Sequence, residues 1–224
     1  MTALKLSLYE DTLPAAADPV YLPALARSLF VVQGALSVES DTGAQWLDTG
    51  AALVEQSEQT LLAGADGATV WRWELSLADH GASRTLRASP ATTSTLKLEQ
   101  ALDLPAGYQW LMRCDRVAFP PGGTAWTHVH QGPGIRCCLN GEISIETEGR
   151  SLSYPPGSAW FEKGPEPVLA PTTEQRDTTF IRCFLLPRQL KGRSSIRYVH
   201  PEDAQRPKVQ AYRVFAERHI QLPQ

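Results

Sequence analysis

The chain has 224 residues, of which 42% are hydrophobic and 20% are charged, and its formal net charge is −3. This balance is that of a globular protein and excludes a disordered chain, while 21 basic against 24 acidic residues provide no basic surface for nucleic acid. No apolar run reaches the roughly 18 residues that a membrane-spanning helix needs, and the N-terminal segment lacks the apolar core of a signal peptide. We therefore expect a cytoplasmic protein with no membrane or nucleic-acid partner.

Strand-like segments recur along the chain and are separated by glycine and proline. They are rich in Val, Ile, Phe, Trp and Thr, and several alternate between apolar and polar residues. The five clearest segments are residues 28–40, 69–77, 108–119, 135–148 and 178–186. A short helix or a turn is predicted in the PEDA sequence, where Pro201 suits the first helical position, and a final strand is predicted near residues 211–220. Because helical periodicity is scarce elsewhere, the pattern predicts an all-β sandwich or barrel.

An internal repeat relates the two halves of the chain. When the sequence is shifted by 107 residues, LFVVQGALSVE falls on RCCLNGEISIE, so that Gly34 matches Gly141. Without a gap, Gly50 then matches Gly157. Several identities at one offset indicate two copies of one structural unit.

The repeat predicts two β domains, residues 1–85 and 100–224. Residues 83–102 are rich in Ser, Thr and Ala and are interpreted as the connection, or as the first strand of the second domain. The four cysteines form no CxxC pair, which disfavours a zinc ribbon or a thioredoxin-type motif. We expect them to be buried free thiols, since cysteine often packs as a small hydrophobe.

His128 and His130 are the residues that point to a metal. Side chains two apart in an extended strand share a face, so both imidazoles could bind one ion with a third ligand from elsewhere. The alternative is a pair of solvated or hydrogen-bonded histidines.

The surroundings of this HxH pair resemble the two motifs of the cupin superfamily. The first motif is a glycine, five residues, HxH, a few residues, usually a glutamate, then six residues and a glycine. The second is a glycine, five residues, P-x-G, two residues and usually a histidine. The matching residues are Gly122, His128, His130, Gly141, Gly149, Pro155 and Gly157. The resemblance implies a bicupin, that is, two tandem cupin-type double-stranded β-helix (jelly-roll) barrels. It also implies one divalent transition metal, namely Fe, Mn, Ni, Zn or Cu.

Two positions depart from the family pattern and leave the ligand set incomplete. Gly134 stands where the family has its glutamate, and Trp160 where it has its second-motif histidine. Glu162 shares a face with Trp160 in a regular strand and is the candidate third ligand. Against this, Glu162 aligns with Glu55 in the first half, which has no HxH and therefore favours a structural role. Gln131 is a further candidate.

The first half carries no useful ligand set. At the 107-residue offset, Tyr21 and Pro23 stand in place of the two histidines, and Leu53 stands in place of Trp160. We therefore expect residues 1–85 to form a degenerate cupin with a structural role.

Arg136, Trp126 and Trp160 are the candidate substrate-binding residues. Arg136 is predicted to face the barrel interior and to bind an acidic substrate group; a salt bridge to an internal acidic residue or an outward orientation are the alternatives. Trp126, on the face of the histidines if the strand is regular, and Trp160 would form an aromatic wall, or simply belong to the core. The basic stretch 187–200 is interpreted as solvated surface, or as a cover whose arginines reach an acidic ligand.

These features favour a metal-dependent enzyme acting on a small acidic or oxygenated molecule. The cupin resemblance implies dioxygenase, isomerase, decarboxylase or lyase chemistry, and no individual residue is assigned as catalytic. The alternative is a non-catalytic small-molecule-binding protein with a partly lost metal site. A storage role is disfavoured by the short length of the chain. A homodimer is expected from the resemblance alone.

Overall fold

The computed structural model describes residues 3–79 and 90–224. The chain divides into two compact units, Met1–Met112 with Arg218–Gln224, and Arg113–Glu217. Two units were expected, but residue 85, the expected end of the first, lies outside the described residues. The segment Thr93–Leu102, which we expected in the connection or in the second domain, pairs with the first strand of the first unit instead.

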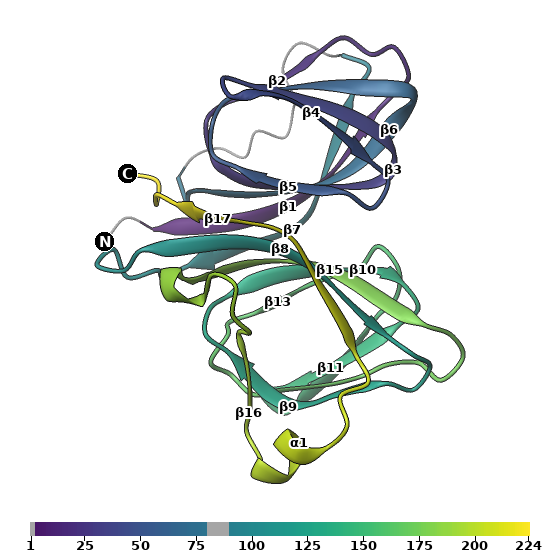
Figure 1. Cartoon of the computed structure of the whole chain (residues 1–224), viewed down its shortest axis with the longest axis vertical. Helices are drawn as coiled ribbons and strands as arrows, with labels where there is room; N and C mark the ends of the chain where they lie inside the picture. The colour runs from purple at the N-terminus through teal and green to yellow at the C-terminus, as the bar shows by residue number, and fades with distance from the viewer. Residues whose placement is uncertain (1–2, 80–89) are drawn as a thin grey trace. The chain divides into compact units, whose positions relative to one another are not determined.

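The first unit is built around one antiparallel sheet (Figure 1). Its strand order is β4-β3-β6-β1-β7, with β2 paired to β6 and β5 paired to β3. The strands are β1 Leu4–Leu13, β2 Val20–Leu22, β3 Ala26–Ser40, β4 Gly43–Asp48, β5 Ala52–Glu55, β6 Gln59–Leu77 and β7 Thr93–Leu102. Leu, Val and Ala side chains from these strands form a buried apolar cluster.

Two five-stranded sheets form the second unit, with orders β13-β10-β15-β8-β17 and β12-β11-β14-β9-β16. The strands are β8 Trp110–Phe119, β9 Thr124–His130, β10 Gly134–Asn140, β11 Ile143–Thr147, β12 Arg150–Tyr154, β13 Ala159–Glu162, β14 Val168–Pro171, β15 Thr178–Pro187, β16 Ile196–Tyr198 and β17 Ala211–Ile220. A buried apolar cluster draws residues from both sheets. The interior of this unit therefore lies between the two sheets.

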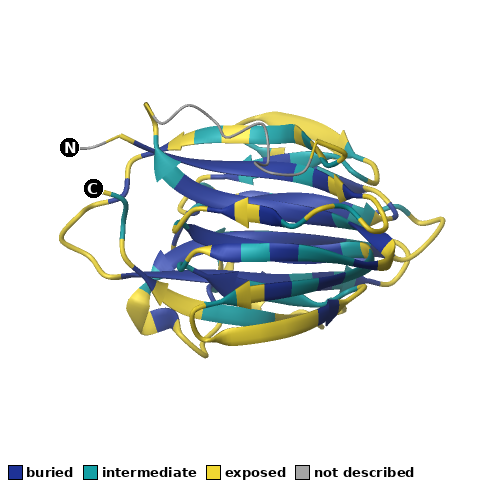
Figure 2. Cartoon of the chain, turned by 90° about the horizontal axis from the view of Figure 1, so that it is seen from above, coloured by how far each residue is buried: buried dark blue, intermediate teal, exposed yellow. Residues whose placement is uncertain are grey.

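The structure confirms an all-β fold. Long strands run through the chain with buried residues along their length (Figure 2). This is expected for antiparallel sheets that pack one face against an apolar core. The only helices in the described ranges are a single 3-10 turn, Arg188–Leu190, and α1, Pro201–Gln205, which begins at the predicted proline. No helix in these ranges has the length and apolar character needed to cross a membrane.

The internal repeat is also a repeat of backbone geometry. In the first unit the amide of Gly50 donates to the carbonyl of Val31 at 2.8 Å, and in the second Gly157 donates to Cys138, also at 2.8 Å. Both pairs are related by the 107-residue offset. The two glycines have φ values of 82° and 80°, a conformation that glycine adopts without strain.

Strand pairing corrects the expected counterparts of the histidines by one residue. Val20 pairs with Leu61 in the first unit as His128 pairs with Val168 in the second, and Leu61 and Val168 are 107 residues apart. Val20 is fully buried, whereas Tyr21 is 54% exposed. The first unit thus presents an apolar side chain to its interior where the second unit presents an imidazole.

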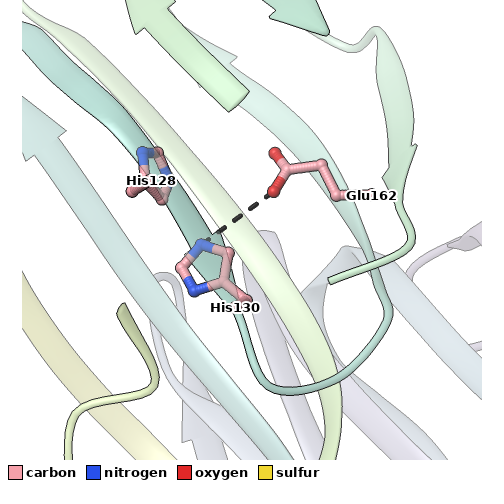
Figure 3. Close-up of side chains that lie close together, drawn as sticks. All are labelled: His128, His130 and Glu162. Atoms are coloured by element: carbon pink, nitrogen blue, oxygen red, sulfur yellow. Dashed lines mark ion pairs between the residues drawn. The ribbon is translucent and has the colours of Figure 1, made fainter. Parts of the chain in front are cut away.

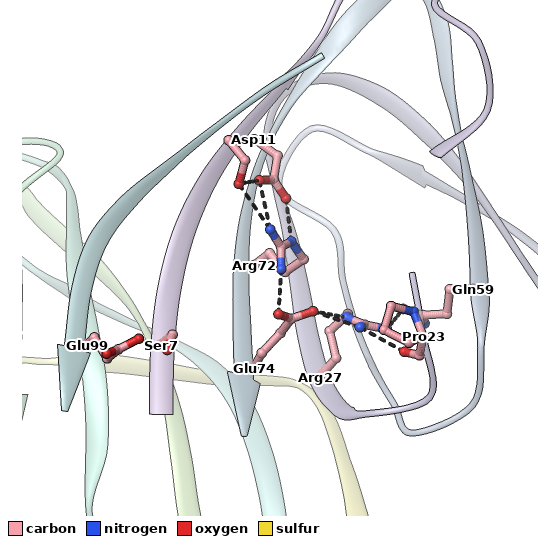
Figure 4. A network of polar contacts seen from close by, with 9 residues as sticks. Ser7, Asp11, Pro23, Arg27, Gln59, Arg72, Glu74 and Glu99 are labelled. Atoms are coloured by element: carbon pink, nitrogen blue, oxygen red, sulfur yellow. Dashed lines mark hydrogen bonds and ion pairs between the residues drawn. The ribbon is translucent and has the colours of Figure 1, made fainter. Parts of the chain in front are cut away.

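Buried charges in the first unit are paired with one another (Figure 4). Glu74 accepts from Arg27 at 2.7 Å and lies 2.6 Å from Arg72, which also pairs with Asp11 at 2.6 Å. Because an unpaired charge is costly in an interior, this network neutralises every charge it contains. We assign it a structural role.

Candidate metal centre

Three potential metal ligands converge in the second unit (Figure 3). His128 and His130 lie on β9 and are 5% and 3% exposed, and Glu162, the last residue of β13, is 8% exposed. One ligand atom from each residue can be chosen so that all lie within 4.8 Å of one another. The i, i+2 spacing on β9 therefore places both imidazoles on the inner face, as predicted, and folding brings Glu162 to them.

Hydrogen bonds orient both imidazoles toward the centre. Nδ1 of His128 lies 2.7 Å from the carbonyl oxygen of Trp126, so this nitrogen carries the proton and Nε2 is left as a ligand. Nδ1 of His130 lies 3.3 Å from the hydroxyl of Ser195, and its Nε2 lies 3.9 Å from Oε2 of Glu162. Burial lowers the pKa of His128 and lowers the pKa of His130 well below its usual range. Neutral imidazoles are the form that binds metals.

The register of β10 and β13 explains why the carboxylate comes from Glu162. Gly134 and Glu162 are directly paired in this antiparallel ladder, so their positions share one face. A Cβ at Gly134 would collide with the carbonyl oxygen of Cys183 on β15. Position 134 therefore has no room for the glutamate that the family pattern places there, and the neighbouring strand supplies a carboxylate instead.

Two side chains hold this carboxylate. Nε1 of Trp160 donates to Oε1 of Glu162 at 2.9 Å, and Nη2 of Arg136 lies 2.7 Å from Oε2. Arg136 is 1% exposed and also donates to the carbonyl oxygen of Gly134 at 2.6 Å. Burial lowers the pKa of Arg136 to about 10, although Glu162 opposes the shift, so the guanidinium is protonated at neutral pH. Of the alternatives for Arg136, the structure has the internal salt bridge.

A cavity of about 600 Å³ adjoins the centre within the second unit. His128, His130, Glu162 and Trp160 line it, whereas Arg136 and Trp126 are not part of its lining. The pairing of β9 with β14 shifts register between Val168 and Ala170, which breaks the alternation that would have placed Trp126 beside the histidines. The ring of Trp126 instead lies 4.1 Å below the guanidinium of Arg206.

The cavity also contains residues that the sequence analysis did not identify. Arg182 on β15 pairs with Asp115 at 2.5 Å, and the hydroxyl of Tyr212 donates to the same carboxylate at 2.9 Å. Arg193, from the predicted basic stretch, and Lys208 line the cavity too. Arg193 was marked by the basic stretch, one interpretation of which was a cover that lends Arg193 or Arg197 to an acidic ligand. No local sequence signal marks Arg182, Tyr212 or Lys208, because only the folding of distant segments brings them together.

The ligand set suits a transition metal. Two histidines and one carboxylate with open positions form the arrangement that binds non-haem iron, and the same nitrogen and oxygen donors accept other divalent ions. The bonds to Trp126, Ser195, Trp160 and Arg136 are the outer contacts that metal ligands usually have. The residues present therefore fit a metal ion.

Comparison with known proteins identifies solved structures with a similar fold. No family model matches the chain, and no curated protein matches it. Among solved structures, oxalate decarboxylase from Bacillus subtilis, described with Mn(II) centres, is similar at a TM-score of 0.63 and 10% identity, covering 86% of this chain and 71% of that one. AerE from Microcystis aeruginosa is similar at a TM-score of 0.56 and 12% identity, covering 83% and 88%. At these identities the similarity establishes the fold alone.

Proposed function

We propose that the second unit, whose glycine and HxH motifs resemble those of the cupin superfamily, is a metal-dependent enzyme acting on a small, oxygen-bearing organic molecule. His128, His130 and Glu162 would hold one divalent transition metal. The observation that carries the proposal is the convergence of these three buried side chains on the wall of a 600 Å³ cavity. Ligand pockets of this size accommodate small organic molecules.

The protein residues have separable tasks in this proposal. The metal, when bound, supplies Lewis acidity toward a substrate oxygen. His128 and His130 provide neutral nitrogen donors whose orientation is set by the carbonyl of Trp126 and the hydroxyl of Ser195. Glu162 provides one negative charge. Because three protein ligands do not complete a coordination shell, positions remain open for the substrate.

The reaction class and the metal are proposed from the fold. Dioxygenase, isomerase, decarboxylase and lyase chemistry are the classes to test. Mn(II) is the first ion to test, since the similar oxalate decarboxylase is described with Mn(II) centres. Iron follows, because the donor set is the one that non-haem iron prefers.

One observation favours a second candidate, a metal-free protein that binds a small molecule without turnover. Both carboxylate oxygens of Glu162 already have a partner, Trp160 on one side and Arg136 on the other. The charge of Glu162 is thus compensated without an ion. In this case the cavity would be a binding site alone.

Elemental analysis of protein purified without chelator or affinity-tag metal separates the two candidates. The proposal predicts about one metal ion per chain, and loss of that metal in the His128→Ala/His130→Ala variant. His200→Ala/His219→Ala is the matched control, because it removes two histidines that are exposed and outside the cavity lining. If none of these proteins contains metal or takes up Mn(II), Fe(II) or Zn(II) on titration, the enzyme proposal is wrong.

A further inference from the structure

The cavity of the second unit is polar at one end and apolar at the other. Along β8, inward-facing residues run from Arg113 and the buried Asp115 to Val117 and Phe119. Asp115 pairs with Arg182 of β15. The apolar ends of β8 and β15 also lie together, since the ring centroid of Phe119 is 6.2 Å from that of Phe180, which comes two residues before Arg182 on β15.

Strand β9 also changes from polar to apolar inward-facing side chains along its length. His130 and His128 pair with Ile196 and Tyr198 of β16, whereas Ala125 pairs with Ala170 of β14. Ala125 and Ala170 belong to the apolar cluster of this unit. The candidate metal centre lies toward the polar end, because Nδ1 of His130 is 3.3 Å from the hydroxyl of Ser195, two residues after Arg193, whose carbonyl oxygen accepts from Arg113. The opposite wall consists of Phe119, Ala125, Ile143, Ile145 and Phe180.

Two cations at the polar end have no carboxylate partner. Arg113 pairs with Glu217, and Arg182 pairs with Asp115, but no ion pair forms at Arg193 or Lys208 within the described ranges. The backbone carbonyl of Arg193 accepts from Arg113 at 3.0 Å, which places this segment at the polar end.

The second cation without a carboxylate partner, Lys208, is close to the same end. Its ammonium lies 4.0 Å from the centroid of the Tyr198 ring, and Tyr198 is directly paired with His128. Lys208 also donates to the backbone carbonyl oxygen of Asp203, which leaves its positive charge without a compensating carboxylate in the described part of the chain. This charge can therefore compensate a negative charge on a molecule that enters the cavity.

We infer that the cavity takes an organic monocarboxylate with an apolar body of about the size of a phenyl ring. The carboxylate lies at the end that carries Lys208, Arg193 and the candidate metal centre, and the body packs against Phe119, Ile145 and their apolar neighbours. A two-carbon diacid would leave the apolar end without a partner. This inference rests on the proposed function, because it names the substrate class of the same cavity.

Calorimetric binding to Mn(II)-loaded protein tests the inference with three probes. 3-Phenylpropanoate has both features, propanoate lacks the ring, and 3-phenylpropanamide lacks the charge. We expect 3-phenylpropanoate to bind at least about tenfold more tightly than propanoate, because even one methylene in an apolar pocket can change affinity by that factor. It should also bind more tightly than the amide.

Variants assign each feature to its end of the cavity. Ile145→Ser should weaken 3-phenylpropanoate and leave propanoate unchanged, whereas Lys208→Gln should weaken both acids and leave the amide unchanged. Lys191→Gln is the matched control, because it removes a positive charge from the same C-terminal segment at an exposed residue outside the cavity lining.

The two proposals fail in distinguishable ways. Equal affinity for 3-phenylpropanoate and propanoate in wild-type protein overturns the inference, and so does equal affinity for the acid and its amide. These comparisons use folded wild-type protein and do not depend on the stability of a variant. The metal content of the same sample reports separately on the proposed function.

Discussion

Two ion pairs of the second unit have the same length but very different burial, and together they form a controlled experiment on the candidate site. Arg136 and Glu162 lie 2.7 Å apart with side chains 1% and 7% exposed. Lys163 and Glu148 also lie 2.7 Å apart, but both side chains are 54% exposed. We predict that Arg136→Met strongly destabilises the metal-free protein and that Lys163→Met does not.

The expected magnitude follows from what each substitution leaves behind. Arg136→Met leaves the carboxylate of Glu162 buried without its cation, which costs about 3–5 kcal/mol. It also removes the donor to the carbonyl of Gly134, worth about 1 kcal/mol, while the methionine side chain restores part of the lost packing. We therefore expect a loss of about 3–5 kcal/mol, a large part of the roughly 5–15 kcal/mol that stabilises a typical domain. Water and salt screen the Lys163 pair, so its loss should not be measurable.

Urea unfolding followed by circular dichroism, with chelator present, measures both free energies of unfolding. The double variant Arg136→Met/Glu162→Gln should recover part of the loss, because it no longer buries an unpaired charge. The reasoning is refuted if Arg136→Met is as stable as Lys163→Met, or if the double variant loses the sum of the two single losses. Either result would mean that Arg136 does not compensate the charge of Glu162 in the folded protein.

Three further predictions concern the rest of the chain. In the first unit, Glu74→Gln should cost about 3–5 kcal/mol in urea unfolding, since it leaves two buried guanidinium groups without their shared carboxylate; a loss below about 1 kcal/mol would contradict this. Gly141→Ala should be about 1–3 kcal/mol more destabilising than Gly149→Ala. Both glycines have a positive φ, but only at Gly141 would a Cβ collide with neighbouring atoms, so equal losses would be inconsistent with the predicted collision. The buried cysteines should not react with a thiol reagent at pH 8 until the protein unfolds, because burial raises the pKa of Cys138 to about 11 and that of Cys183 well above its usual range; rapid reaction of folded protein would show that these thiols are accessible.

Features set by local periodicity were predictable from the sequence. The strand ending at Ser40, the helix beginning at Pro201 and the final strand at residues 211–220 were all found. Each depends on alternation of apolar residues or on a residue that fixes the backbone, and these two signals can be recognised without knowing the neighbouring strand. The repeat was visible for the same reason, since glycine turns recur at one offset.

The register between paired strands was harder to predict from the sequence. The prediction for Trp126 assumed a regular strand, but a register shift opposite β9 removes it from the cavity lining. A shift of one residue likewise moved the counterpart of His128 from Tyr21 to Val20. Because side chains alternate with a period of two, a single irregularity reverses which residues face inward.

The shared face of His128 and His130 was predictable from their spacing in an extended strand, and the all-β class from the recurring strand-like segments. The position of Glu162 beside the histidines, and the pairing of Arg136 with Glu162 instead of a place in the cavity lining, required the folded structure. The same is true of Lys208, which the C-terminal segment brings into the lining of the cavity. These placements depend on which strands pair and in which register, and that is settled by the packing of the whole unit.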